Sequence, residues 1–415
     1  MNENQNIPKL RFEGFTEPWE QHKLGDLAEI KDSARVPNNL WSTSGVPYIR
    51  ASDVSNDDLQ GVLFLFQEVF DFYRKKTGAP VRGDVLFNGG GEIGKSLFIN
   101  TDQQLYAQGG AVLYARTSES KRLDGVFLSE IFQSRTVKKY IGSTSKGGTM
   151  KHFTLEPAKS MPLLIPNDVS EQHDIGFFLR DLDNLVTLYQ HKYERLQHLK
   201  QALLRKMFPK PGEQVPELRF EGFTEPWEQR KFKDIVTIER GGSPRPIEDF
   251  VTDSPNGLNW VKIGDAPSLG RYITRTAEKI RPEGLSKTRQ VYPGDLILSN
   301  SMSFGRPYIM AIEGCIHDGW LLIRDTTKQL DPIYLCQMLG TPQMFNQYRS
   351  LAAGSTVNNL NKELVGNAVV PIPCKEEQKV IGKVLDDLDN LVILHQHKYE
   401  RLQHLKQALL RKMFI

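Results

Sequence analysis

The chain contains two nearly identical frames, each enclosing a different insert. Residues 8–21 read PKLRFEGFTEPWEQ and residues 216–229 read PELRFEGFTEPWEQ, with a single difference. A second repeated pair, residues 181–208 and 387–414, differs at only two positions. The segments between these copies hardly match. The repetition predicts two units that share a framework and a kind of partner but act on two different targets.

The composition is that of an ordinary globular protein. The chain has 415 residues, 39% hydrophobic and 25% charged, so two globular units with connectors are expected. A net charge of +3 does not by itself indicate a nucleic-acid partner. Cys315, Cys336 and Cys374 lack metal-ligand spacing, which predicts reduced thiols and a cytoplasmic location. No apolar run is longer than that of Val62–Phe66, so neither a secretory signal nor a membrane span is expected.

The repeated carboxy-terminal segments have the pattern of long helices. Apolar residues recur at three- and four-residue steps from Glu171 onward, with Ser170 as candidate N-cap and Pro209 as terminator. Such a helix would have about 37 residues and a length of about 55 Å. A helix this long needs a packing partner. Since the second copy is the same kind of helix, an antiparallel pair of the two is expected.

The heptad pattern of the first helix predicts a two-stranded coiled coil with a partly polar seam. One set of seam positions is apolar, and the other alternates leucine with lysine. The first set is Leu182, Tyr189, Leu196 and Leu203, and the second is Leu185, Lys192, Leu199 and Lys206. The second copy places Leu388, His395, Leu402 and Leu409 at the first set of positions.

The predicted fold class is α+β, with two mixed α/β insert domains joined by the two long helices in a pseudo-twofold tandem repeat. The predicted segments are an arm and first insert domain (1–169), a first helix (170–208), a linker (209–217), a second insert domain (218–375) and a second helix (376–415). The predicted strands are 48–51, 85–87, 97–99 and 111–115 in the first half, and 260–263, 296–298, 308–310 and 321–323 in the second. Residues 124–132 and 331–339 have the pattern of helices capped by aspartate.

Residues 89–96, GGGEIGKS, match the phosphate-loop pattern G-x-x-x-x-G-K-[ST]. A phosphate loop requires a strand before it and a helix after it. The residues that follow are strand-like, and the equivalent second-half segment, NSMSFGRP (300–307), has no phosphate signature. We therefore expect a strand–turn–strand corner that presents Lys95, or Arg306 in the second half, to a DNA phosphate or a guanine edge. A nucleotide site stays open as the weaker alternative.

Other patterns do not form a catalytic constellation. Asp331–Tyr334 faintly resembles a methyltransferase motif, but the equivalent first-half segment at Asp124 does not, so a helix start is the better interpretation. Glu92 and Lys95 lack the spacing of a nuclease cluster. Most histidines lie on the long helices and are expected to be solvated or between helices. The chain is predicted not to be an enzyme.

Two features of the repeated frame leave a choice between structural and binding roles. The stretch His191–Lys206 has five Lys or Arg against one Glu, which suits a solvated helix face, a partner subunit or DNA. Trp19 and Trp227 lie in the repeated arm. They are either core anchors or exposed groups that dock two copies of one partner.

Four shared motifs resemble those of the DNA-specificity subunit of Type I restriction–modification systems. They are the GFTEPWEQ arm, the GD…G(K/R) hairpin, a GGT or GST loop, and an EQ-x-x-I-G run at the start of each long helix, within 166–176 and 373–382. They occur twice in the same order and cover essentially the whole chain, which makes the resemblance specific.

The resemblance implies that the inserts are target recognition domains, each of which reads one half of a bipartite, asymmetric DNA sequence. It implies that the paired helices set the spacer and dock two methyltransferase subunits. S-adenosylmethionine, ATP and Mg are implied on partner subunits only, including a motor–nuclease subunit, and none in this chain. The amino-terminal arm is expected to pack near the carboxy-terminal helix, in a circular arrangement.

Candidate site residues follow from loop position and side-chain type. The candidate DNA contacts are Arg50, Lys95, Lys146, Thr149, Lys151, Lys262, Ser301, Arg306, Thr356 and Asn358. The candidate partner contacts are Trp19, Trp227, Lys192, Arg195, Lys398 and Arg401. Apart from the phosphate-loop alternative, the competing interpretation is a tandem scaffold that binds two proteins and no DNA, which predicts no salt-dependent DNA affinity.

Overall fold

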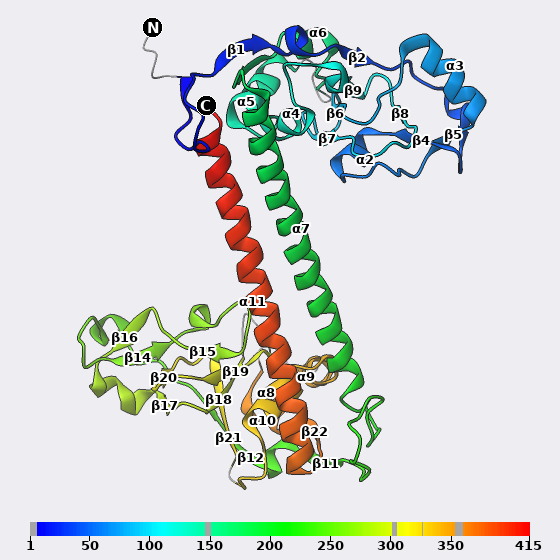
Figure 1. Ribbon diagram of the computed structural model, residues 1–415. Coiled ribbons are helices and arrows are strands. Elements are labelled where there is room, and N and C mark those ends of the chain that lie inside the picture. Colours follow the sequence, from blue (N-terminus) through cyan, green and yellow to red (C-terminus); the bar gives the residue numbers. More distant parts are fainter. Residues whose placement is uncertain (1–5, 146–150, 301–304, 326, 353–359) are drawn as a thin grey trace. The chain divides into compact units, whose positions relative to one another are not determined.

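The computed structural model describes residues 6–145, 151–300, 305–325, 327–352 and 360–415. They form two compact units (Figure 1). Unit 1 comprises Met1–Leu188 together with Tyr399–Ile415, and unit 2 comprises Tyr189–Lys398. Each unit thus combines one arm and one insert with part of both repeated helices.

Unit 1 contains two four-stranded sheets and one two-stranded sheet. The first sheet has the order β2 (Ile30–Asp32), β9 (Val112–Ala115), β6 (Val85–Asn88) and β7 (Ser96–Phe98), all antiparallel. The second has the order β3 (Trp41–Ser42), β5 (Phe64–Leu65), β4 (Val46–Ile49) and β8 (Tyr106–Ala107), with β4 and β8 parallel. The third pairs β1 (Glu20–Lys23) with β10 (Pro162–Ile165). The helices are α1 (Leu24–Leu27), α2 (Ala51–Ser55), α3 (Gln67–Thr77), α4 (Gly125–Ile131), α5 (Arg135–Thr144), α6 (Leu155–Lys159) and the first part of α7 (Val169–Lys206), with 3-10 turns η2 (Asn38–Leu40) and η3 (Thr117–Glu119).

Unit 2 repeats this topology with additional strands. One sheet has the order β12 (Val236–Arg240), β21 (Trp320–Asp325), β18 (Leu296–Ser299), β19 (Pro307–Met310) and β15 (Tyr272–Ile273). The other has the order β13 (Val251–Thr252), β16 (Glu278–Ile280), β14 (Leu258–Val261), β20 (Gly314–Ile316) and β17 (Arg289–Val291), and β11 (Glu228–Lys231) pairs with β22 (Val369–Ile372). The helices are α8 (Pro332–Leu339), α9 (Pro342–Ala352), α10 (Lys362–Asn367) and α11 (Lys375–Met413), with 3-10 turns η4 (Phe232–Asp234), η5 (Ile247–Asp249), η6 (Ile263–Asp265) and η7 (Pro282–Lys287).

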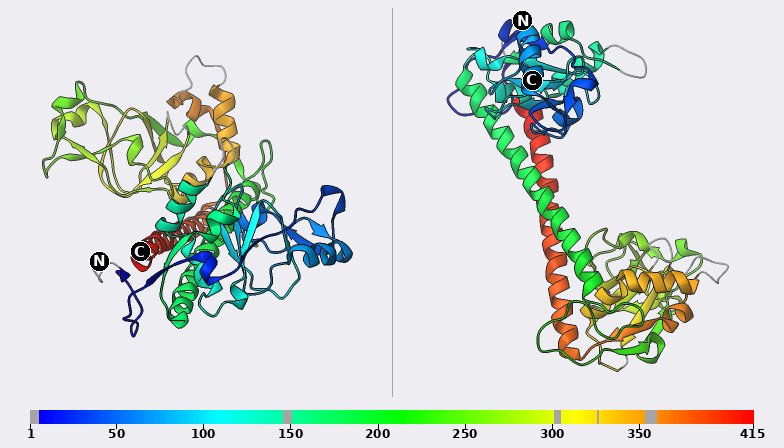
Figure 2. Two further views of the ribbon diagram at one scale, coloured as in Figure 1. Left: turned by 90° about the horizontal axis from the view of Figure 1, so that it is seen from above. Right: turned by 90° about the vertical axis from the view of Figure 1, so that its right-hand side faces the viewer.

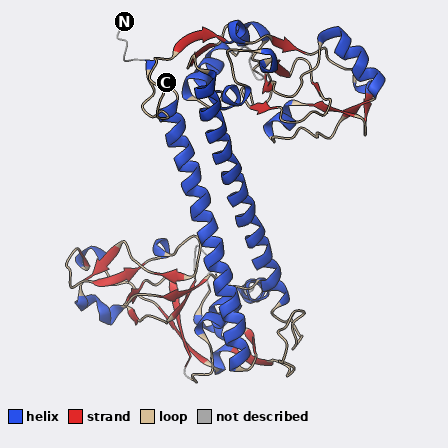
Figure 3. Ribbon diagram, viewed as in Figure 1, coloured by secondary structure: helices blue, strands red, loops and turns tan. Residues whose placement is uncertain are grey.

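The predicted α+β class is confirmed, with mixed helix and strand in both units (Figure 3). The predicted strands lie within one or two residues of β4, β6, β7, β9, β14, β18, β19 and β21. Asp124 and Asp331 cap α4 and α8, as predicted. The first long helix begins one residue earlier than predicted. Asp168, not Ser170, acts as its cap, because the Asp168 carboxylate accepts a hydrogen bond of 2.8 Å from the Ser170 N–H.

A buried carboxylate at the start of each long helix holds the arm of the same unit. Glu171 is fully buried and accepts hydrogen bonds of 2.6 and 2.7 Å from the Arg11 guanidinium. In unit 2, Glu377 accepts two hydrogen bonds of 2.8 Å from Arg219. A charge without water is stable only when it is paired in this way. The Glu of the EQ-x-x-I-G run is therefore a structural anchor.

The glutamine and the glycine of that run contact the backbone of the insert. The side-chain amides of Gln172 and Gln378 accept hydrogen bonds of 2.9 and 2.8 Å from the Asp124 and Asp331 N–H groups. A Cβ at Gly176 would lie 2.6 Å from the Phe127 backbone nitrogen, so only glycine fits there. The run therefore supports the starts of α4 and α8 partly through their backbone.

Each arm also packs on the end of a repeated helix. In unit 1, the Leu10 N–H donates to the carbonyl of Lys412 at 3.0 Å, and in unit 2 the Leu218 N–H donates to that of Lys206 at 2.8 Å. These contacts support the expected packing of the amino-terminal arm against the carboxy-terminal helix. In both Figures 1 and 2, the end of α11 (red) lies beside the first part of α7 (green) in unit 1.

The arm tryptophans are core anchors. Trp19 and Trp227 are each 1% exposed. Trp19 meets Phe414 edge-on at 6.4 Å, and Trp227 meets Phe208 at 6.2 Å. The alternative in which these indoles form exposed docking groups is therefore wrong, because their rings fill the core where the arm, the insert and a helix end meet.

The predicted seam of the helix pair is half wrong. Leu182 lies on the seam as predicted, but Leu185 and Leu199 are 44% and 47% exposed. The second set of seam positions is instead the residue four places after each member of the first set. Lys200 in unit 2 and Lys406 in unit 1 are two of these positions. The sequence pattern favoured leucine over lysine for a dry seam. The structure accommodates lysine because a carboxylate of the opposite helix faces it.

The same lysine–aspartate pair forms in both units, and each long helix supplies the lysine in one unit and the aspartate in the other. In unit 1, Lys406 pairs with Asp183 and lies 3.7 Å from Glu130 of α4. In unit 2, Lys200 pairs with Asp389, which also accepts hydrogen bonds from Arg271 and Gln337. The aspartate and lysine are identical in the two repeats, and the third partner comes from each insert. The polar contacts around each lysine–aspartate pair therefore depend on the insert of that unit.

Burial in the unit 1 cluster raises the pKa of Glu130 to about 7, although Lys406 opposes that shift. Since the unfolded carboxyl titrates near 4.5, its contribution to stability is complete below that pH and is lost as the pH rises toward 7. The equivalent position in unit 2, six residues after the capping aspartate of α8, is Gln337.

We therefore expect Glu130→Gln to stabilise the protein by about 2 kcal/mol at pH 8 and to flatten the fall in stability between pH 4.5 and 7. The gain stays below the full value of the pKa shift because the buried Gln amide also needs hydrogen-bond partners. Urea unfolding at several pH values measures this. Glu156→Gln, at an exposed carboxylate of the same unit, should change neither quantity. A less stable Glu130→Gln protein at pH 8 would contradict the account.

Candidate nucleic-acid interface

A hairpin in each unit presents a cation directly after a glycine. In unit 1, β6 and β7 are antiparallel neighbours, with Phe87 opposite Ser96. In unit 2, β18 and β19 pair in the same way. The phosphate-loop match therefore lies on a strand–turn–strand corner, as predicted, and no helix follows it. This geometry does not place backbone amides at a helix N-terminus, as a nucleotide phosphate requires.

The glycines of the hairpin are explained by packing. Gly94 has φ +81°, and a Cβ there would lie 2.8 Å from the Cδ1 atom of Ile141 on α5. Its counterpart Gly305 has φ +73°, and a Cβ would lie 2.8 Å from a ring carbon of Tyr348 on α9. Both positions combine a left-handed backbone with close contact to a helix, so glycine is needed for structure.

The residue after each of these glycines is an exposed cation. Lys95 follows Gly94, and Arg306 follows Gly305. No carboxylate among the described residues lies within ion-pair distance of either side chain. Arg306 donates to the Ser268 carbonyl at 2.7 Å, and its guanidinium lies 5.2 Å from the centre of the Tyr308 ring. Both hairpins can therefore offer a positive charge to a phosphate.

The surroundings of Lys95 are positive. Burial lowers the pKa of the Lys138 ammonium on α5, and the nearby charges of Lys406 and Lys95 lower it further. Burial raises the pKa of Asp57, and Lys95 opposes that shift. Asp57 is thus the carboxylate that partly offsets the cations beside this hairpin.

Arg50 and Lys262 occupy equivalent structural positions after β4 and β14. The Arg50 N–H donates to Asp53 at 2.9 Å, and its guanidinium forms an ion pair with the same carboxylate at 2.9 Å. Lys262 caps η6 through a hydrogen bond of 2.7 Å from its N–H to Asp265, and its ammonium pairs with Glu278. Both charges are thus already neutralised, which makes these residues weaker DNA candidates than Lys95 and Arg306.

The remaining candidates divide into three groups. Lys151 is exposed beside the start of the segment that leads to α6. The other candidate DNA contacts, Lys146, Thr149, Ser301, Thr356 and Asn358, lie outside the described residues. Lys192, Arg195, Lys398 and Arg401 are exposed on α7 and α11.

The sequence interpretation missed the surroundings of these four helix cations. Leu185 and Leu188 precede Lys192 and Arg195 at three- and four-residue steps, and Leu199 follows, so all five share one face of α7. The same face of α11 carries Leu391, Leu394, Lys398, Arg401 and Leu405. The six leucines are 44–47% exposed. We call these two faces the leucine–basic stripes. The sequence signal for these stripes is a second series of residues at three- and four-residue steps, next to the series that forms the seam.

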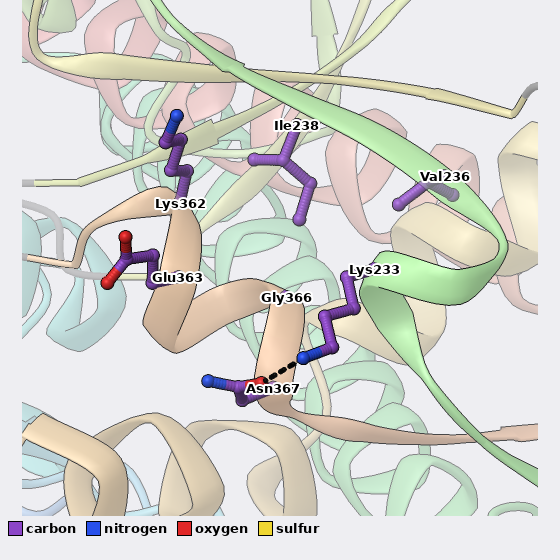
Figure 4. Close-up of a pocket in the computed structure, with 7 residues that line it drawn as sticks. All are labelled: Lys233, Val236, Ile238, Lys362, Glu363, Gly366 and Asn367. Carbon is purple, nitrogen blue, oxygen red and sulfur yellow. Dashed lines mark hydrogen bonds between the residues drawn. The ribbon is translucent and has the colours of Figure 1, made fainter.

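A shallow pocket in unit 2 does not have the groups of an active site. It has a volume of about 420 Å³ and is lined by Lys233, Val236, Ile238, Lys362, Glu363, Gly366 and Asn367. Lys233 points toward Asn367 and donates to it at 3.0 Å (Figure 4). The lining offers no nucleophile with an adjacent general base.

Two features are absent from the part of the chain that the structure describes. There, no group of three or more His, Cys, Asp or Glu side chains could hold a metal ion. Within the same residues, no helix is both long and apolar enough to cross a membrane.

Comparisons with known proteins agree with this geometry. The sequence profile of the Type I restriction modification DNA specificity domain matches residues 16–198 and 224–404. Two specificity subunits of Methanocaldococcus jannaschii, those of the putative type I restriction enzyme MjaX and of MjaVIII, are each 22% identical. Both matches cover 98% of this chain, and 95% and 94% of the relatives.

The fold also matches a solved structure. The crystal structure of the Type-I restriction-modification system S subunit from M. genitalium matches with a TM-score of 0.64 over 99% of both chains, at 14% identity. Because two copies of the family profile together cover most of the sequence, the chain belongs to the type I restriction–modification DNA specificity family, whose members are non-catalytic specificity subunits.

Proposed function

We propose that this chain is the DNA-reading subunit of a cytoplasmic type I restriction–modification complex, and that each unit reads one half of a bipartite, asymmetric sequence in double-stranded DNA. The observation that carries the proposal is the tandem family match to two units with equivalent frames and divergent inserts. Two different reading surfaces on equivalent frames suit two different half-sites. The long helices would set the spacer between them.

The hairpin cations are the best-supported DNA contacts. Lys95 and Arg306 are exposed, lie at equivalent hairpin tips and are held on rigid strands. Phosphate contacts made by such cations position a protein on DNA, and a few further contacts read the base edges. The alternatives are not favoured: the hairpin lacks the helix of a phosphate loop, and a scaffold without DNA contact leaves the family match unexplained.

The leucine–basic stripes suit two copies of one partner protein. Their five residues are identical in the two repeats, although the helices differ at two neighbouring positions. Exposed leucines flanked by Lys and Arg can bury an apolar helix face and pair with acidic residues at its rim. We assign the stripes to two methyltransferase subunits, which would carry S-adenosylmethionine. A motor–nuclease subunit with ATP and Mg would join through that complex.

The proposed reading function is tested by exchanging one insert. The chain is co-expressed with its methyltransferase subunit, and adenine methylation is mapped across the host genome. We expect a bipartite motif with a fixed gap. Replacing residues 30–160 by the corresponding insert of another specificity subunit should change one half of that motif and leave the gap and the other half unchanged. A contiguous motif, or a change in both halves, would contradict the proposal.

The docking assignment predicts a loss of assembly from charge introduced into the stripes. Leu199→Glu with Leu405→Glu should abolish co-purification of the methyltransferase subunit, because two carboxylates would replace apolar contacts. Both side chains are 47% exposed, so the variant chain should keep its melting temperature. The matched control is Gln201→Glu with Gln407→Glu, at exposed positions off the stripe. Normal co-purification of the leucine variant would show that the partner binds elsewhere.

A further inference from the structure

Helix α3 of unit 1 exposes an aromatic side chain beside a group of cations. Phe72, Lys75 and Lys76 lie three or four residues apart, so they share one face of the helix. Phe72 is 63% exposed, which is unusual for a phenylalanine that could have been turned inward. The apolar side of α3 is already occupied by Phe70, which is buried in the core of unit 1.

The cations at the end of α3 are available for a ligand. Arg74, Lys75 and Lys76 are exposed, and none of them forms an ion pair with any residue that the structure describes. The acidic residues of the helix, Glu68 and Asp71, lie in its first half. The dipole of the helix favours cations near its C-terminus, but it does not account for an exposed ring on the same face.

A neighbouring loop adds a further positive charge. The Ala34 N–H donates to the Thr77 hydroxyl at 3.1 Å, which fixes the loop against the end of α3. The next residue, Arg35, is exposed. The Lys31 ammonium would lie 3.8 Å from a Cβ at Gly78, which ends the helix, and it is shared with Glu29 at 3.1 Å.

The described part of unit 2 has no equivalent of this surface. The stretch between β16 and β18 contains η7 and β17 where unit 1 has α3 between β5 and β6. The registers of the two main sheets also give opposite charges at one position. Ile30 pairs with Ala115 in unit 1 as Ile238 pairs with Ile323 in unit 2, so Lys31 corresponds to Glu239. The positive surface around α3 therefore belongs to one reading unit alone.

We propose that Phe72, Lys75 and Lys76, with Arg35, form an additional contact of unit 1 with the phosphate backbone of double-stranded DNA. This inference rests on the proposed function and deepens it. DNA matches the surface because a row of phosphates would pair with several adjacent cations, and the Phe72 ring would pack on the sugars between them. Figure 1 shows α3 at the end of unit 1 farthest from α7, so the contact would extend the footprint of this unit beyond the hairpin.

The test uses the full chain assembled with its methyltransferase subunits. Binding to a duplex that carries the mapped methylation motif is measured by fluorescence anisotropy over a range of salt concentrations. In the Lys75→Gln, Lys76→Gln variant, we expect the slope of log affinity against log salt to become shallower by about 1 to 2, because each lost phosphate contact contributes about 0.9. Affinity should fall equally for specific and unrelated duplexes, and the methylation motif should not change.

Two further variants separate the proposed contact from a general effect of charge or folding. Phe72→Ala should weaken binding several-fold with an unchanged salt slope, because no charge is removed. Lys23→Gln with Lys121→Gln removes two exposed cations elsewhere in unit 1 and should leave the slope at the wild-type value.

Either of two results would overturn the inference and leave the proposed function intact. One is a wild-type slope in the Lys75→Gln, Lys76→Gln complex, and the other is an equal loss of slope in the Lys23→Gln, Lys121→Gln control. A wild-type complex without salt-dependent DNA binding would instead overturn the proposed function, and the α3 contact with it. Binding of this face to a protein or a lipid surface would appear as an unchanged DNA slope.

Discussion

The buried pair between the arm arginine and the glutamate of the EQ-x-x-I-G run in each long helix is the interaction on which the rest of the structure depends. Glu171 and Glu377 have no exposed surface, so each requires the guanidinium of Arg11 or Arg219. Removing one partner of such a pair costs on the order of 3–5 kcal/mol. The pair fixes the arm, the arm places its tryptophan in the core, and the tryptophan packs against the phenylalanine that directly follows the end of a long helix. One polar contact thereby brings three separate segments together.

The frame holds its divergent inserts partly through contacts with their backbone, in addition to side-chain packing in the core. Gln172 and Gln378 bind backbone N–H groups, and Gly176 and Gly382 approach the backbone of α4 and α8. Such contacts do not depend on which side chains the insert carries. Selection on the reading surface can therefore change much of an insert, provided that the aromatic rings of Phe127 or Tyr334 still fill the core shared with the frame. The charged seam shows the limit of this freedom, since Glu130 in one insert and Arg271 in the other are matched to identical lysines and aspartates.

The hairpins and the capped helices were predictable from the sequence because each occurs in both halves of the chain. Because the phosphate-loop pattern is absent from the second copy, the sequence favoured a structural hairpin over a nucleotide site, and the close packing of Gly94 and Gly305 explains the glycine that both copies share. The capped helices at Asp124 and Asp331 follow from local chemistry that a sequence carries openly.

Other features depend on tertiary contacts that no local pattern shows. A lysine in the seam is stable only because an aspartate almost two hundred residues away faces it, so heptad rules chose Leu185 and Leu199 instead. The burial of Trp19 and Trp227 likewise depends on the distant helix ends, which left their role open. Arg50 and Lys262 were chosen as cations in loops, and only the structure shows that Asp53 and Glu278 already neutralise them.

The central claim is that each unit is completed by the end of the other repeat's helix, through contacts that are equivalent in the two units. A circular permutant tests it most directly: the chain is opened at Gly212, and Ile415 is joined to Asn6 through a copy of residues 209–214. The account predicts a melting temperature close to that of the original chain and the same bipartite methylation motif. A control with a flexible insertion at Gly212 establishes that the opening site is tolerated. If the control is folded but the permutant is unfolded, or methylates a different motif, the proposed equivalence of the two arms is wrong.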